Sequence, residues 1–153
     1  MPQVETQDEE AVLIERGGFK VDRARALDKI RSYRRGDVGS VWLFLRAASA
    51  AGASAAAVRR TPDGFTVEFD GAAFPEDVLA DPYSALFQED GASDCRRWLA
   101  LGLIHAFGPG LRLVSVESGP KDGRRRFSAR DVGLEVVASV PDAGDKNVVR
   151  VKA

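Results

Sequence analysis

The order in which hydrophobic patterns follow one another constrains the fold of this chain more than any other sequence feature. Helical spacing of apolar residues comes first, at 22–35 and from about Ser40 to Ala51. Strand-like segments dominate the end of the chain, at Leu111–Val116, Arg124–Ser128, Leu134–Val140 and Val148–Val151. We therefore expect an α+β protein, a two-layer α/β sandwich with helices packed on one face of a mixed, mostly antiparallel sheet.

A turn signal and a third helix complete the expected order of elements. Pro62-Asp63-Gly64 separates two short alternating segments, which predicts a β-hairpin with strands at Ala55–Arg60 and Phe65–Phe69. Phe69 falls on the apolar face of the second strand, so we expect it in the core. A helix should run from Ser93 or Asp94 to Phe107, and the four final strands should form an antiparallel meander.

Length and composition indicate one ordinary globular domain. The 153 residues divide into a flexible acidic tail at 1–10 and a single domain at 11–153. A formal net charge of -1 argues against nucleic acid as a partner, and no apolar run is long enough to span a membrane. One cysteine and one histidine exclude disulfide frameworks and multi-histidine metal centres. The expected location is the cytoplasm.

Three strings in this element order resemble the GHKL nucleotide-binding family of gyrases, ninety-kilodalton heat-shock chaperones, histidine kinases and mismatch-repair ATPases. The first, WLFLRAASAAGAS (Trp42–Ser54), resembles the helix that carries the family's Glu and Asn. The second, VEFDGAAFP (Val67–Pro75), resembles its adenine-binding turn, and the third (Trp98–Gly119) its glycine-rich turn, helix and strand. The resemblance covers about 22–152 and implies a Bergerat-like ATPase fold.

The matching positions imply a domain that has lost catalysis. Leu43 stands where the family's general base should be, and Ala47 stands at the magnesium-binding Asn. Neither side chain can accept a proton or bind Mg²⁺. Phe69 matches the Asp that accepts the adenine amino group, and Trp98 and Ala100 match glycines that let phosphate approach. We therefore expect no catalytic residues, no metal ligands and no ATP hydrolysis.

Asp70 and Gly71 are the only candidate cofactor-binding residues. Gly71 matches the first glycine of the adenine turn, whereas Ala73 replaces the second. Asp70 is one residue beyond the expected position, so it would serve only if the strand ended early or bulged. The competing interpretation is an aspartate that stabilises the turn.

The resemblance implies a degenerate, non-catalytic domain that serves protein interaction, dimerisation or regulation and needs no cofactor. Its partner would be another protein, an attached domain or a second copy. One alternative is an ATP- or ADP-binding module, with or without magnesium, of a chaperone- or kinase-like protein. Another is a carrier of a small apolar ligand in the former nucleotide pocket. That pocket would be lined by Leu43, Ala47, Phe69 and Trp98.

The remaining chemical groups favour structural interpretations. We expect His105 at the edge of the core, and Cys95 to be incidental despite its place near a helix N-terminus. The segment Val41–Leu45 is apolar on every side of its helix, which predicts a helix that is either buried or packed against a sheet. A basic cluster should form a solvated hairpin tip; it comprises Lys121, Arg124, Arg125 and Arg126.

Overall fold

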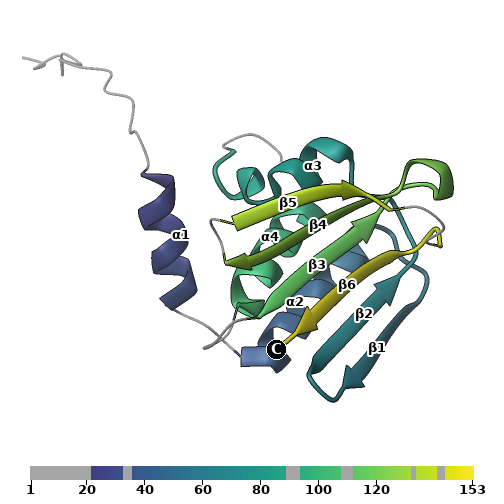
Figure 1. Cartoon of the computed structure of the whole chain (residues 1–153), viewed down its shortest axis with the longest axis horizontal. Coiled ribbons are helices and arrows are strands. Elements are labelled where there is room, and N and C mark those ends of the chain that lie inside the picture. Colours follow the sequence, from purple (N-terminus) through teal and green to yellow (C-terminus); the bar gives the residue numbers. More distant parts are fainter. Residues whose placement is uncertain (1–21, 33–35, 89–93, 108–111, 132–133, 141–143) are drawn as a thin grey trace, which may run out of the picture.

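The computed structural model describes residues 22–32, 36–88, 94–107, 112–131, 134–140 and 144–153. The helices are α1 (Arg23–Ser32), α2 (Gly36–Ala50), α3 (Glu76–Ala80) and α4 (Asp94–Ala106), with short 3-10 turns η1 (Pro82–Leu86) and η2 (Lys121–Gly123). The strands are β1 (Ala56–Thr61), β2 (Gly64–Phe69), β3 (Leu113–Ser118), β4 (Arg125–Asp131), β5 (Leu134–Ser139) and β6 (Asn147–Lys152). Figure 1 shows α2, α3 and α4 on one side of a single sheet, so the two-layer α+β architecture is confirmed. The predicted acidic tail at 1–10 lies outside the described residues.

The six strands are joined in the order β1-β2-β6-β3-β4-β5. Each of the five pairings in this part of the chain is antiparallel, so the sheet is antiparallel rather than mixed. The prediction of a four-strand meander is wrong. Only β3, β4 and β5 form one, because β6 inserts between β2 and β3 and joins the hairpin to the meander. Pairing of residues so distant in sequence is not encoded in local patterns.

Local signals place the ends of the first two helices. The backbone N–H of Arg25 donates to Asp22 Oδ1 at 3.2 Å, the bond expected of a helix N-cap. Helix α2 begins at Gly36, before the predicted Ser40, and is followed by Gly52 with a φ of +76°. A left-handed residue ends a helix, and glycine adopts that conformation without steric cost.

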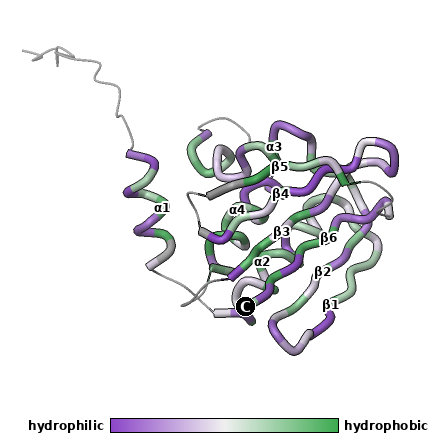
Figure 2. The backbone as a smooth tube through the Cα atoms, viewed as in Figure 1, coloured by the Kyte–Doolittle hydropathy of each residue, from purple (hydrophilic) through white to green (hydrophobic). Residues whose placement is uncertain are grey.

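The core lies between the helices and one face of the sheet. In β2 the buried residues Phe65, Val67 and Phe69 alternate with the less buried Thr66 and Glu68. Figure 2 shows the corresponding alternation of hydrophobic and hydrophilic residues along the strands. Phe69 packs with Phe74 in an edge-to-face contact, with ring centres 6.3 Å apart. The prediction that Phe69 belongs to the core is therefore confirmed.

Candidate functional site

The turn after β2 carries both residues predicted to bind a cofactor, and Asp70 is engaged with the loop that follows α2. Its Oδ1 accepts hydrogen bonds from the backbone N–H groups of Ser54 at 2.8 Å and Ala55 at 2.9 Å. Its Oδ2 accepts the Ser54 hydroxyl. These bonds, first that of the Ser54 hydroxyl and then those of the backbone, lower the pKa of the Asp70 carboxyl. The carboxylate thus joins two loops, and its role toward a nucleotide stays a prediction.

Gly71 brings the same turn against the end of α2. It has a φ of +96°, and a Cβ on it would lie 2.7 Å from the carbonyl oxygen of Ala51. The next N–H, that of Ala72, donates to the same Ala51 oxygen at 2.8 Å. Only glycine permits this close approach at a left-handed position. The backbone conformation and the close packing therefore explain why glycine occupies this position, without a role in ligand binding.

A buried polar network holds the other end of the turn, and sequence reasoning missed it. The Phe74 N–H donates to Ser118 Oγ at 2.7 Å, and Ser118 Oγ donates to Asn147 Oδ1 at 2.5 Å. Asn147 Nδ2 then donates to the Ala72 carbonyl oxygen at 3.1 Å. Ser118 ends β3 and Asn147 begins β6. The two residues are 29 positions apart, so only the non-local pairing of these strands brings them together.

Among the described residues, the four side chains expected to line an apolar ligand pocket divide between the core and a surface groove. Ala47 and Phe69 are buried in the hydrophobic core, in the cluster that also contains Leu99 of α4. Leu43 and Trp98 instead line a groove on the outer side of the helical layer. The small-ligand alternative stays a prediction, since in the described part of the chain its four lining residues divide between the packed core and this groove.

That groove, here called the α2–α4 groove, is an open apolar hollow of about 920 Å³. It is lined by Ile30, Val38, Gly39, Trp42, Leu43, Arg46, Trp98, Leu101 and His105. Trp42 is 63% exposed and Val38 is 73% exposed. Of the two interpretations of this all-round apolar segment, the helix that packs against a sheet fits: Leu43 and Phe44 are buried, whereas Trp42 on the outer side is exposed. The Arg46 guanidinium lies 4.8 Å from the centre of the Trp98 ring, a cation–π contact at the groove wall.

The lone histidine and cysteine are both on α4. His105 is buried near the end of the helix and faces the groove, as expected for a residue at the edge of the core. Cys95 lies in the first turn of α4 and is half-buried. Within the described residues, no three His, Cys, Asp or Glu side chains are close enough together to hold a metal ion.

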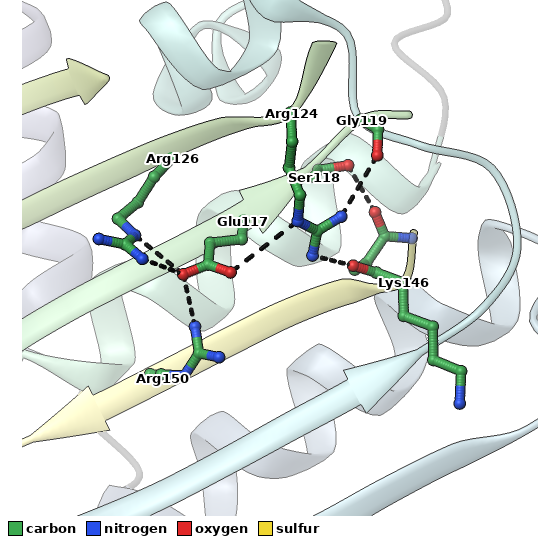
Figure 3. Close-up of polar contacts among 8 residues, drawn as sticks. Glu117, Ser118, Gly119, Arg124, Arg126, Lys146 and Arg150 are labelled. Atoms are coloured by element: carbon green, nitrogen blue, oxygen red, sulfur yellow. Dashed lines mark hydrogen bonds and ion pairs between the residues drawn. The ribbon is translucent and has the colours of Figure 1, made fainter. Parts of the chain in front are cut away.

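The open face of the sheet carries a cluster of arginines around one glutamate (Figure 3). Glu117 of β3 has a side chain only 4% exposed, and its Oε1 accepts hydrogen bonds from both Arg126 and Arg150. Arg124 is 1% exposed; it donates to the carbonyl oxygens of Gly119 and Lys146, and its Nε lies 3.9 Å from Glu117 Oε2. The predicted solvated basic tip is therefore wrong for Arg124. Sequence reasoning missed Glu117, although its place in an alternating strand puts it on this face.

Two carboxylates on the helical side of the molecule form more exposed ion pairs. Asp37, at the start of α2, binds Arg112 bidentately, with one N–O distance of 3.0 Å. Asp81 binds Arg23 of α1 in the same way. In each case the hydrogen bond from the arginine side chain is the main cause of a lowered carboxyl pKa. These pairs connect α2 to the start of β3, and α1 to η1.

Comparison with known protein families and curated sequences identified no relative of this chain. No protein-family model matches this sequence, and no curated protein sequence matches it. Across the described residues, none of the helices combines the length and the apolar character that a membrane crossing requires.

Proposed function

We propose that this chain is a degenerate, non-catalytic GHKL-like domain that acts in the cytoplasm as a protein-interaction module. The observation that carries the proposal is the α2–α4 groove, where Trp42 and Val38 remain exposed beside an apolar hollow of about 920 Å³. Contiguous exposed apolar surface on a folded domain is typical of a docking site. Tryptophan and arginine are also the residues that contribute most often to binding energy at protein interfaces.

The lining of the groove indicates the chemistry of its partner. Arg46 on α2 approaches Trp98 on α4, and Phe44 on α2 lies beside Gly102 on α4, so the two helices run antiparallel. A channel between two helices suits an amphipathic helix whose apolar stripe lies along it. Arg46 supplies a positive charge at the wall, so the partner helix should carry a carboxylate opposite it.

The two tryptophans of the chain make a direct test possible, because both line this groove. The probe is a synthetic amphipathic helix with a leucine stripe and one central glutamate; the control helix has lysine at that position. We expect a saturable blue shift of tryptophan emission with the first helix and a weaker one with the second. Arg46→Gln should remove the difference between the two helices.

A second copy of the chain is the competing occupant of the groove. If the domain pairs with itself there, tryptophan emission should shift as the protein alone is concentrated, and Trp42→Gln should abolish that shift. Emission that responds neither to the helix nor to protein concentration would overturn the groove as a docking surface.

The non-catalytic part of the proposal is supported by the surroundings of the matching positions. Ala47 and Phe69 are both buried in the hydrophobic core, and Asp70 already accepts three hydrogen bonds from the loop after α2. We expect millimolar ATP with magnesium to leave the melting temperature unchanged. A ligand at a hundredfold excess over its Kd would add about 2.7 kcal/mol to the stability of the native state, a shift of several degrees. An upward shift that disappears in Asp70→Asn would favour the nucleotide-binding alternative.

A further inference from the structure

A row of hydroxyl and guanidinium groups crosses the open face of the sheet. The registers of four neighbouring strand pairs align its members, which are Arg59, Thr66, Arg150, Ser115 and Ser128 on β1, β2, β6, β3 and β4. Neighbouring strands are about 4.8 Å apart, so adjacent side chains in the row can contact one ligand. The row therefore places hydroxyl and guanidinium hydrogen-bond donors in a fixed order on neighbouring strands.

Positive charge exceeds negative charge beside this row. The carboxylate of Glu117 faces the guanidinium groups of Arg124, Arg126 and Arg150, while the nearby carboxylate of Glu68 pairs with Lys146. Because Arg126 and Arg150 share the oxygen Oε1, each directs only part of its donor set toward Glu117. Lys152 follows two residues after Arg150 on the same face, and among the described residues it has no ion-pair partner.

Part of the row and of the charged cluster surrounds a small hollow of about 220 Å³ on β6, β3 and β4. It is lined by Leu113, Ser115, Glu117, Arg126, Ser128, Arg150 and Lys152. We propose that this hollow, the phosphate cradle, binds the phosphate group of a phosphate monoester. The Ser115 and Ser128 hydroxyls would donate to phosphate oxygens from the floor, while Arg126, Arg150 and Lys152 would neutralise its charge. Glu117 acts as a positioning residue, because it holds two of these arginines in place.

The composition of the face favours an isolated phosphate group over a nucleic acid. Single-stranded nucleic acids are held largely by bases stacked on aromatic side chains. In the described part of this face, the residues of the row and the cradle include no aromatic side chain. The phosphate could belong to a small metabolite or to a phosphorylated serine of another protein, and both present the same dianion to the cradle.

The test is an NMR titration with three probes at matched ionic strength. Inorganic phosphate represents the free group, a phosphoserine peptide with neutral flanking residues represents a modified protein, and the same peptide without phosphate is the blank. We expect saturable shifts in the amide signals of Ser115, Ser128 and Lys152 with both phosphate probes and none with the blank. Tighter binding of the phosphopeptide would identify a modified protein as the source, and equal binding a small metabolite.

Variants inside and outside the cradle distinguish a specific phosphate site from general attraction of anions to a basic surface. Lys152→Gln and Ser128→Ala leave the Glu117 ion pairs intact and should each weaken phosphate binding about fivefold to tenfold. Arg59→Gln removes one positive charge from the same face, but it lies three strands from Ser115, about 14 Å away, and should change Kd less than twofold. Equal weakening by Arg59→Gln and Lys152→Gln, or the absence of localised shifts, would overturn the proposal.

Discussion

The two faces of the sheet bury side chains by opposite means. On the helix-covered face, Phe127 is buried and its ring contacts Tyr83 edge-to-face, with ring centres 6.4 Å apart. On the open face no second layer is needed to bury Glu117, because the arginines around it form its cover. On β4, for example, Phe127 enters the apolar core, whereas its neighbour Arg126 joins the ionic cluster. The comparison teaches that burial on the open face depends on charge balance, whereas burial on the other face depends on packing.

The difference has an energetic consequence. Removing atoms from a packed apolar face leaves a cavity whose cost grows with its volume. Removing one charge from a buried ionic cluster leaves the opposite charges without compensation. The first loss is insensitive to salt, and the second is partly relieved where the remaining charges can reach water, as Arg126 and Arg150 can. The substitutions below follow from this contrast.

Phe69→Ala should have the largest effect. The side chain is buried in the core, so its removal should lower the free energy of unfolding by about 3–5 kcal/mol, measured by urea denaturation. Thr66→Ala, on the opposite face of the same strand, should cost under about 1 kcal/mol. Similar losses from the two substitutions would contradict the assignment of the faces.

Glu117→Gln should have the second largest effect. The amide keeps the shape of the side chain but leaves three guanidinium groups without a carboxylate, at a cost of about 2–3 kcal/mol. The matched control is Glu76→Gln. Glu76 is 65% exposed and pairs with Arg125 at 3.2 Å, so its loss should cost at most about 0.5 kcal/mol. If both variants unfold at the same urea concentration, the Glu117 cluster does not hold the open face together.

The exposed ion pairs of the helical side should contribute less, and with a predictable dependence on pH. The folded state lowers the pKa of Asp37 and Asp81 below the ordinary unfolded value of about 3.9. Their stabilising contribution is therefore present above pH 4 and is lost as the pH falls through the lowered folded pKa. Asp37→Asn should reduce the stability difference between pH 5 and pH 3 by at most about 1 kcal/mol. High salt should also reduce the stability difference between pH 5 and pH 3 in the wild type. If Asp37→Asn leaves that difference unchanged, the Asp37–Arg112 pair does not contribute to stability.

Trp42→Gln should have the smallest effect on stability, at most about 0.5 kcal/mol, because the ring is already exposed. Thermal unfolding checks this directly. A drop comparable to that of Phe69→Ala would mean that Trp42 packs against the body of the domain and is not available for docking.

The parts of this fold that could be predicted from the sequence are those set by neighbouring residues. The period-two pattern of β2 correctly places Phe69 in the core, and the Pro62-Asp63-Gly64 signal correctly predicts the hairpin. Asp22 caps the first helix where the segment 22–35 is expected to begin, and Gly52 follows directly after the expected end of the second helix at Ala51. Each of these depends on a few consecutive residues, whose spacing is visible in the sequence.

The missed features depend on tertiary arrangement rather than on neighbouring residues. The burial of Arg124 requires carbonyl groups at Gly119 and Lys146, and the second lies on the connection that leads into β6. The exposure of Trp42 depends on how much of α2 the sheet covers, which apolar periodicity does not specify. Glu117 could have been suspected from its alternation with Ser115, but its partner Arg150 is fixed only by the register of β3 with β6.

Because β6 lies between β2 and β3, the sheet cannot be completed until the end of the described chain has been synthesised. The inner edge of β2 finds its partner only when Asn147 follows Phe69, roughly 80 residues later along the chain. At a translation rate of about 5–20 residues per second, the β1–β2 hairpin waits about 4–16 s with an unsatisfied edge. During that interval Phe65, Val67 and Phe69 lie on a strand that could pair with other nascent chains. The hairpin is thus the segment most dependent on rapid translation or on a holding chaperone.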